Sequence, residues 1–147
     1  NLLALKALEK DYAGKVQCVF IDPPYNTGRD FSDFKDKFES SAYFREIFLK
    51  PRIVECWRVL KKDGNIVVHV DPTISHHVRI VLDEVFGEKK FVNEIAWVTG
   101  GNAKNKNKMN RFHDSIICYK KSNKSKFFPM YQEYDEEYKK KSSVKIC

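Results

Sequence analysis

The feature that most constrains the fold is a pair of short apolar runs that flank a long helical pattern. Residues 16–21 and 66–70 are rich in valine and isoleucine and are bounded by turn-forming residues, which predicts two buried strands. Between them we expect a helix from Ser40 or Ser41 to about Lys62. Its apolar positions are Phe44, Ile47, Phe48, Val54, Trp57 and Leu60. A strand, a helix and a second strand form a unit with parallel, neighbouring strands, so the chain is predicted to be an α/β protein.

The remaining pattern extends this unit. Pro51 is expected to kink or split the first helix, because proline interrupts the backbone hydrogen bonds. Asp71 has the position of an N-cap for a second helix that stops at Gly87. Residues 91–98 and 115–119 flank a turn-rich stretch, which predicts an antiparallel hairpin. Together these elements predict part of a doubly wound, Rossmann-like domain, with parallel strands and an antiparallel hairpin at one edge.

The sequence Asp22-Pro23-Pro24-Tyr25 follows the first predicted strand directly. Ligands of open parallel sheets bind beyond the carboxyl ends of the strands, so a functional site is expected at this turn. Aspartate and proline are also ordinary turn residues, and a purely structural turn is the alternative. Asp71 follows the second strand in the same way. It would bring a second carboxylate to this edge, although helix capping explains it fully.

Three segments of the chain together carry a family resemblance. The run from Asp22 continues as Asn26-Thr27-Gly28, and residues 64–71 and 91–97 read GNIVVHVD and FVNEIAW. In this order they resemble the β-class DNA adenine-N6 methyltransferases, which include the modification subunits of type III restriction-modification systems. The resemblance extends from Leu2 to about Lys121. It implies a class I methyltransferase fold, S-adenosylmethionine as the methyl donor and no metal. It implies that the catalytic residues are Asp22, Pro23, Pro24 and Tyr25, and that Asp22 and Asn26 contact the cofactor.

The chemistry of amine methylation explains these residue types. The exocyclic amine of adenine is a weak nucleophile because its lone pair is delocalised into the ring. The Asp22 carboxylate and a backbone carbonyl of the Pro23-Pro24 turn can accept hydrogen bonds from the amine and direct its lone pair towards the methyl group. The base must first leave the duplex stack, and Tyr25 offers a flat face for the flipped adenine. The two prolines make the turn rigid, so that these groups stay aimed.

Three alternatives remain open. Cytosine-N4 methyltransferases more often carry serine at the position of Asp22, which favours adenine as the substrate base. Enzymes that methylate glutamine side chains or RNA are a second alternative, but the glutamine-methylating families usually carry asparagine at this position. The third is a basic, non-catalytic nucleic-acid-binding module, in which the Asp22 turn is structural.

The net charge of +7 is concentrated in the last third of the chain. Residues 1–101 contain 15 basic and 15 acidic side chains, whereas residues 102–147 contain 12 basic and 5 acidic ones. Such a basic end favours a polyanionic partner. We predict DNA contacts from the hairpin loop, with a solvated loop tip as the alternative. The residues are Lys104, Lys106, Lys108 and Arg111. The family resemblance implies as partners double-stranded DNA with a flipped adenine, a restriction subunit and a second methyltransferase subunit.

The resemblance also implies a segment that this sequence lacks. Related enzymes hold the cofactor with a glycine-rich F-x-G-x-G segment, which in the β class follows the catalytic half, and none of the six glycines here forms one. We therefore expect a fragment that is inactive alone, with residues 1–121 as the catalytic half and 122–147 as a basic, disorder-prone start of a further region. The sequence has no signal peptide and no apolar run that could cross a bilayer, so we expect a cytoplasmic protein without membrane contact.

Two sets of side chains have structural explanations. Three cysteines lie in apolar segments and are predicted to be buried thiols, namely Cys18, Cys56 and Cys118. Three phenylalanines in or next to the loop after Tyr25 either line the mouth of the base pocket or pack in the core, and core packing is favoured. These are Phe31, Phe34 and Phe38.

Overall fold

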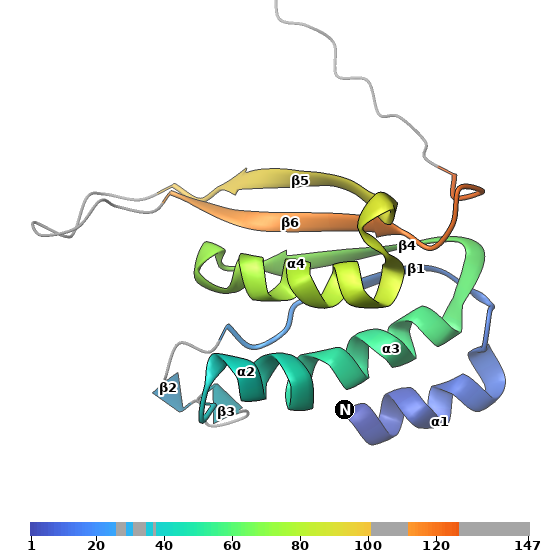
Figure 1. The fold of residues 1–147 in the computed structure, drawn as a ribbon, viewed down its shortest axis with the longest axis horizontal. Helices are drawn as coiled ribbons and strands as arrows, with labels where there is room; N and C mark the ends of the chain where they lie inside the picture. Colours follow the sequence, from blue (N-terminus) through green and yellow to red (C-terminus); the bar gives the residue numbers. More distant parts are fainter. Residues whose placement is uncertain (26–28, 31–34, 37, 101–111, 127–147) are drawn as a thin grey trace, which may run out of the picture.

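The main sheet of the protein contains four strands in the order β1-β4-β6-β5 (Figure 1). The computed structural model describes residues 1–25, 29–30, 35–36, 38–100 and 112–126. The four strands are β1 Val16–Ile21, β4 Leu60–Val70, β5 Phe91–Val98 and β6 His113–Lys120. A separate ribbon pairs β2 Arg29–Asp30 with β3 Lys35–Asp36. With the helices described below, this arrangement confirms the predicted α/β class.

The pairing of the strands confirms the predicted topology. β1 and β4 are parallel, with Ile21 opposite Val68. β6 is antiparallel to β4, and β5 is antiparallel to β6, so β5 and β6 form the hairpin expected at one edge of the sheet. Because β1 and β4 run side by side in the same direction, their carboxyl ends meet at one edge. Asp22 and Asp71, which follow these two strands, therefore emerge at the same edge.

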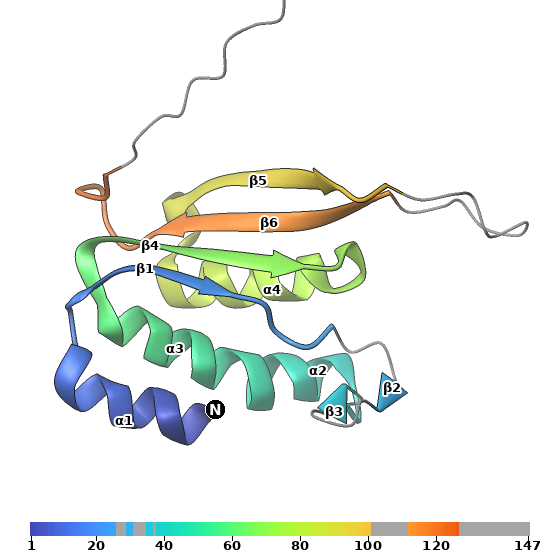
Figure 2. The same cartoon turned by 180° about the vertical axis from the view of Figure 1, so that it is seen from behind.

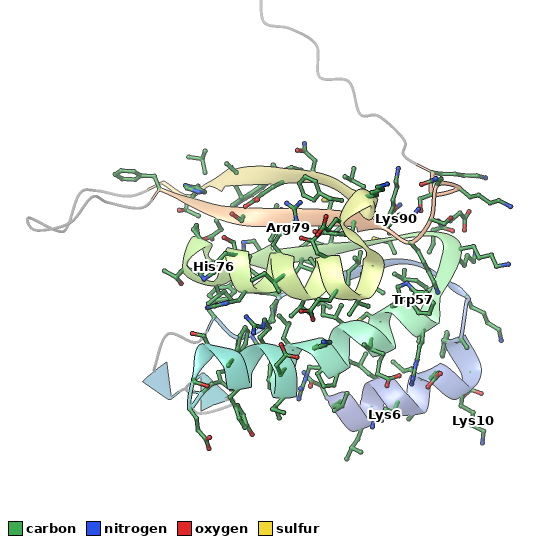
Figure 3. All side chains as sticks on the ribbon, viewed as in Figure 1. Lys6, Lys10, Trp57, His76, Arg79 and Lys90 are labelled. Atoms are coloured by element: carbon green, nitrogen blue, oxygen red, sulfur yellow. The ribbon has the colours of Figure 1, made fainter. Side chains whose placement is uncertain are left out.

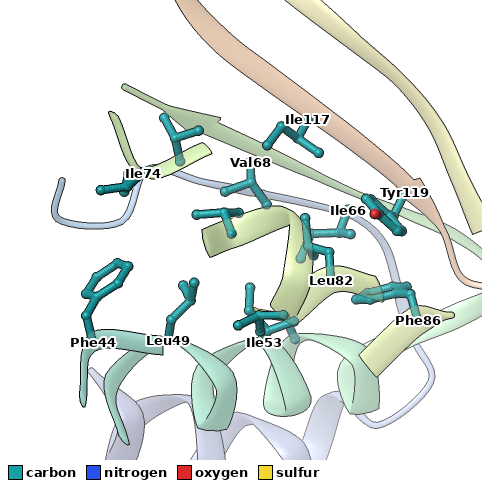
Figure 4. Close-up of a cluster of buried hydrophobic side chains, with 14 of the residues drawn as sticks. Phe44, Leu49, Ile53, Ile66, Val68, Ile74, Leu82, Phe86, Ile117 and Tyr119 are labelled. Carbon is teal, nitrogen blue, oxygen red and sulfur yellow. The ribbon is translucent and has the colours of Figure 1, made fainter. Parts of the chain in front are cut away.

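The helices gather on one side of the main sheet (Figures 1 and 2). They are α1 Leu2–Tyr12, α3 Lys50–Val59 and α4 Pro72–Phe86, with the shorter segments α2 Ser41–Tyr43, η1 Phe44–Leu49 and η2 Glu88–Lys90. The core lies between this layer and the sheet (Figure 4). Alternate side chains of β4 point into it, for example Ile66 and Val68, both fully buried. No helix among the described residues has the length and apolar character of a membrane span.

One helical segment, α2–η1–α3, connects the two parallel strands. Ser40 caps its start, and the Ser40 hydroxyl accepts a hydrogen bond from the Tyr43 amide at 3.1 Å. The middle part, η1, is π-helical and ends next to Pro51, which occupies the first turn of α3. Pro51 therefore lies where the segment changes from π-helical to α-helical geometry, and the helical backbone continues through it without the expected split.

The buried face of this segment differs from the one predicted. Leu49, Ile53 and Cys56 are buried, whereas Ile47 and Trp57 are partly exposed. A π-helical turn contains more residues than an α-helical turn, so it rotates the side chains that follow relative to a regular 3.6-residue pattern. The segment also ends earlier than expected, because the chain becomes extended at Leu60 and continues as β4.

α4 is fixed against the hairpin by a small polar and aromatic cluster. The Tyr119 hydroxyl of β6 donates a hydrogen bond to the Asp83 carboxylate of α4. Burial and this hydrogen bond raise the pKa of Tyr119. The guanidinium carbon of Arg79, which extends from α4 (Figure 3), lies 3.5 Å from the ring centroid of Phe91 on β5. These contacts hold the hairpin in place beside β4.

β1 is less buried than predicted. In the described part of the chain it pairs with β4 alone, and the helices cover only one face of the sheet. Phe20, on the other face, is therefore 63% exposed, and Cys18 is exposed as well. The prediction that Cys18 is a buried thiol is wrong. Cys56 is buried, and this burial raises the pKa of its thiol to about 11, whereas Cys118 is half-buried.

The open face is the face of the main sheet that lies opposite the helices. Strand register places Phe20 beside Val67, and His69 in a row with Ile116 and Ile95. Trp97 pairs with Asp114 one step further along the hairpin. Several of these side chains are large, apolar and exposed: Phe20, Ile95 at 48% and Trp97 at 59%. Among the described residues nothing covers the open face, which is an apolar surface with polar groups near one end.

Candidate active site

The turn Asp22-Pro23-Pro24-Tyr25 lies at the carboxyl end of β1, next to the end of β4. Asp22 is solvent-accessible, with 56% of its side chain exposed, whereas both prolines and Tyr25 are half-buried. Tyr25 also packs against the hydrophobic core. The position is the edge of a parallel strand pair, where ligands of α/β sheets bind. The structure therefore brings the four predicted catalytic residues together at the predicted edge.

The hydroxyl group of Tyr25 ties the turn together. It donates a hydrogen bond to Asp22 Oδ1 at 2.6 Å, the length of a strong bond to a carboxylate. The pKa of Tyr25 is raised, first by burial, then by this hydrogen bond, and further by the negative charges of Asp22, Asp114 and Asp71. Tyr25 therefore stays protonated at neutral pH and acts as a hydrogen-bond donor.

His69 of β4 lies between two carboxylates on the open face. Its Nδ1 atom is 3.3 Å from the Tyr25 hydroxyl oxygen and 3.7 Å from Asp22 Oδ1. Its Nε2 atom is 3.5 Å from Asp114 Oδ2. The imidazole and the Tyr25 ring are nearly perpendicular, at 81°, with centroids 6.3 Å apart. Four side chains from three neighbouring strand ends thus form one connected polar cluster: Asp22, Tyr25, His69 and Asp114.

The sequence pattern did not single out His69 or Asp114 as site residues. His69 stands at an alternate position of an apolar strand, which indicates only that it faces away from the core. Asp114 meets it because β6 lies against β4, with Ile116 opposite His69 and Asp114 two residues further along. Such diagonal neighbours are within reach of long side chains. No pattern within either strand indicates this contact, since it depends on the pairing of the strands.

Asp71 is a helix cap, as favoured from the sequence. Asp71 Oδ1 accepts hydrogen bonds from the Thr73 amide and the Thr73 hydroxyl, both at 2.7 Å. The side chain is buried at the start of α4. Its negative charge nevertheless reaches the site, because it contributes to the raised pKa of Tyr25.

Several predicted site residues lie outside the described residues. These are the cofactor residue Asn26, the loop residues Phe31 and Phe34, and the proposed DNA contacts Lys104, Lys106, Lys108 and Arg111. Phe38, which is described, packs in the core: its ring centroid lies 5.0 Å from that of Phe44 and 4.8 Å from that of Phe48. Core packing is thus confirmed for this member of the set. The described residues contain no group of three or more potential metal ligands.

A groove of about 490 Å³ runs along the unpaired side of β1 and reaches the site. It lies between α1, β1 and the η1–α3 segment, and most of its lining is apolar. Apolar lining residues include Leu5, Val19, Ile21, Leu49 and Cys56. The groove also contacts Asp22 and the two prolines of the turn, and its other polar lining residues are Asn1 and Arg52. An apolar surface therefore extends along the groove as far as the Asp22 carboxylate.

Comparison with known proteins agrees with this geometry. Residues 16–146 match the DNA methylase family, which is most of the chain. The chain belongs to the DNA methylase family. The matched residues include β1, the Asp22 turn, β4 and the hairpin, so all members of the polar cluster lie within the match.

Individual relatives support the same assignment. The chain is 30% identical to the EcoP15I Mod subunit of a type III restriction-modification enzyme from Escherichia coli, with 83% of this chain and 23% of that protein aligned. It is 37% identical over 65 residues to the DNA adenine methyltransferase YhdJ from Escherichia coli, with 44% of this chain and 21% of that protein aligned. The solved structure of the PvuII cytosine-N4-specific DNA methyltransferase has the same fold, with a TM-score of 0.62 and 17% identity over 84% of this chain and 48% of that one.

The chain is shorter than the proteins it matches. It spans between 18% and 28% of the length of three curated relatives.

Proposed function

We propose that the full-length protein is a site-specific DNA methyltransferase of a restriction-modification system. It transfers a methyl group from S-adenosylmethionine to the N6 amine of adenine in double-stranded DNA. The observation that carries this proposal is the accessible Asp22 carboxylate at the carboxyl end of β1, held by the Tyr25 hydroxyl within a chain of the DNA methylase family. The proposed cellular location is the cytoplasm.

The Asp22 turn provides what methylation of an amine requires. Asp22 and a carbonyl of the Pro23-Pro24 turn accept hydrogen bonds from the two amine hydrogens, which directs the nitrogen lone pair away from the turn. When bound, the sulfonium of S-adenosylmethionine would supply the methyl group to this nitrogen, and the electron pair of the broken carbon–sulfur bond would stay on sulfur. The Asp22 carboxylate, which holds the amine, can accept the proton that the amine then loses.

The same turn provides a surface for the base. The Tyr25 ring is fixed at both ends, because its hydroxyl is bonded to Asp22 and its ring packs against the core. A flipped adenine can stack on the remaining face of the ring. The ring would then hold the base plane while Asp22 holds the amine.

The proposal extends to parts of the protein outside the described residues. Asn26 is proposed to contact the cofactor beside Asp22. Four cations of the hairpin loop are proposed to contact the DNA backbone, namely Lys104, Lys106, Lys108 and Arg111. Residues 1–121 are proposed to form the catalytic half, and 122–147 to begin a further region. Support for a restriction subunit and a second methyltransferase subunit as partners comes from the similarity to a type III Mod subunit.

Cytosine-N4 methylation is the second candidate. It is supported by the structural similarity to the PvuII cytosine-N4-specific enzyme. The similarity to an adenine methyltransferase and the presence of Asp22 favour adenine. The two bases present their amines in different ring contexts, so the product distinguishes the two candidates directly.

The test uses the full-length protein, S-adenosylmethionine labelled in its methyl group, and duplex DNA. Nucleoside analysis of the digested product should show label in N6-methyladenine. Label in N4-methylcytosine would support the second candidate. Asp22→Ala should lower methyl transfer by about a hundredfold or more and spare DNA binding. Asp11→Ala, a matched change of an exposed carboxylate on α1, should leave both unchanged. If the wild type and Asp22→Ala bind DNA equally and the wild type transfers no methyl group, the non-catalytic binding module is supported instead.

A further inference from the structure

His69 and Asp114 belong to the polar cluster, but neither takes part in the methyl transfer proposed for the Asp22 turn. His69 is only 23% exposed and Asp114 only 22%, so both are partly removed from water. Their contact at 3.5 Å is at the long end for a hydrogen bond. Polar contacts in unliganded active sites are often long and tighten when the substrate binds. The position of His69 against the Tyr25 hydroxyl therefore calls for a functional explanation.

The number of available hydrogens limits which hydrogen bonds this cluster can form at the same time. The Tyr25 hydroxyl has one hydrogen, and it is donated to Asp22 Oδ1 at 2.6 Å. His69 Nδ1 lies 3.3 Å from the same hydroxyl oxygen, and it can accept the Tyr25 hydrogen only in the tautomer that carries hydrogen on Nε2. Asp114, as a carboxylate, only accepts, so it favours the imidazole tautomer with hydrogen on Nε2. In that tautomer Nδ1 carries a lone pair and competes with Asp22 for the Tyr25 hydrogen.

The competition matters because Asp22 has another hydrogen bond to make. In the proposed function, the Asp22 carboxylate must accept a hydrogen bond from the substrate amine. While the Tyr25 hydroxyl occupies Oδ1, part of the negative charge of Asp22 is directed to Tyr25. A rotation of the hydroxyl hydrogen from Asp22 to His69 Nδ1 releases that oxygen. The proton stays on the Tyr25 oxygen throughout, so only hydrogen bonds are exchanged.

We propose that His69 is a positioning residue that accepts the Tyr25 hydroxyl hydrogen and so frees Asp22 for the substrate amine. Asp114 is a second positioning residue, which fixes the tautomer and orientation of His69. This inference rests on the proposed function, because it concerns the binding of an amine at Asp22. It assigns a role to two residues on β4 and β6 that lie outside the Asp22 turn.

A double-mutant cycle in the full-length protein tests the proposal. His69→Phe should lower the single-turnover methylation rate about tenfold or more, because the hydroxyl then stays on Asp22. The same change in a Tyr25→Phe background should have little effect, since no hydroxyl remains to compete. The Tyr25→Phe change keeps the ring for stacking. A role of His69 in folding alone would produce the same loss in both backgrounds, and that result, like no loss in either, overturns the proposal.

Two further variants sharpen the test. His69→Asn should retain most of the activity, because its amide places a polar atom close to the position of Nδ1. His113→Gln is the matched control, since His113 is an exposed histidine next to Asp114 and outside the cluster. It should keep the wild-type rate. Cofactor affinity, measured by calorimetry, should not change in any of these variants, because the effect is on the chemical step.

A readout without activity separates this inference from the proposed function. 3-Fluorotyrosine incorporated at position 25 gives a fluorine resonance that reports the hydrogen bonding of the hydroxyl. His69→Phe should shift this resonance, whereas His113→Gln should not. An unchanged resonance in His69→Phe contradicts the contact itself. A shifted resonance in a wild-type protein that methylates no DNA would support the contact and reject the proposed function.

Discussion

At the scale of single residues, the Asp22 carboxylate and the Tyr25 ring have separate tasks within one turn. Asp22 is exposed enough to meet a substrate, and its orientation is set by the Tyr25 hydroxyl at 2.6 Å. Tyr25 is half-buried and rests on the core. The carboxylate therefore supplies the chemical contact, and the ring supplies a fixed surface beside it.

Substitution of these two residues should have different consequences. In the full-length protein, Asp22→Ala should lower the single-turnover methylation rate by about a hundredfold or more, because it removes an acceptor that acts most strongly as the methyl group transfers. Tyr25→Ala should also impair methylation, whereas Tyr25→Trp or Tyr25→Phe should retain much of the activity through stacking, which contributes roughly 1–3 kcal/mol per base. Near-normal turnover of Asp22→Ala, or a Tyr25→Trp variant as inactive as Tyr25→Ala, would contradict these roles.

The cysteines differ in reactivity at the same scale. A thiolate is the reactive species, so a thiol whose pKa is raised to about 11 is almost entirely protonated at pH 7 to 8. Cys56 is also buried, whereas Cys18 is exposed. We expect iodoacetamide to alkylate Cys18 quickly at pH 8 and Cys56 only after unfolding. Peptide mass spectrometry at increasing times measures the alkylation of both cysteines. Equal rates for the two thiols in the folded protein would contradict the burial of Cys56.

At the scale of elements, the close approach of β1 and β4 depends on Gly64. A Cβ atom at this position would lie 2.9 Å from the Gln17 carbonyl oxygen and 3.0 Å from a methyl group of Leu60. Backbone atoms of a strand pair cannot move apart without loss of hydrogen bonds. Gly64 thus allows β4 to stay close to β1 where the register shifts, just before the regular pairing of residues 65–68 with β1 that leads to His69.

Gly64→Ala should therefore destabilise the domain. The expected loss is about 1–3 kcal/mol in the free energy of unfolding, the usual range for a side chain forced into a packed site. Gly100→Ala is the matched control, because a Cβ there meets nothing within 4 Å and the backbone has no positive φ. Urea denaturation followed by circular dichroism measures both variants. Equal midpoints for the two would show that the strands can accommodate the methyl group.

At the scale of the whole molecule, the open face and the unpaired side of β1 are the notable surfaces. Phe20, Ile95 and Trp97 are exposed on the open face, and the apolar groove lies along β1. The Asp22 cluster stands where these two surfaces meet. Among the described residues, the site is thus bordered by the groove on one side and by β4 and the hairpin on the other.

This geometry predicts weak cofactor binding by residues 1–147 alone. The resemblance to β-class enzymes implies that a glycine-rich strand-to-helix turn forms much of the cofactor pocket, and the sequence contains no such turn. Isothermal titration of the 147-residue chain with S-adenosylmethionine should therefore give weak binding or none. The full-length protein is the positive control. A micromolar dissociation constant for the short chain would mean that the cofactor site lies within these residues.

The elements near the site were predictable because their determinants are local. The apolar runs 16–21 and 66–70, the Asp71 cap and the hairpin all follow from spacing, turn residues and capping chemistry, which act over a few residues. The Asp22 turn was predictable for a similar reason: it follows a strand directly, and its family resemblance is carried by adjacent residues. Local sequence therefore determined these elements, their order and the position of the Asp22 turn.

Tertiary structure alone decided which side chains meet at that turn. The contact between His69 and Asp114 exists because β6 pairs with β4 in one particular register, and these residues are 45 positions apart in the chain. The exposure of Cys18 and Phe20 was likewise decided by the layer of helices on one face of the sheet. Apolar sequence patterns indicate that a side chain can be buried, but burial also needs a second element to cover it. Only the packing of elements far apart in the sequence supplies that cover and those contacts.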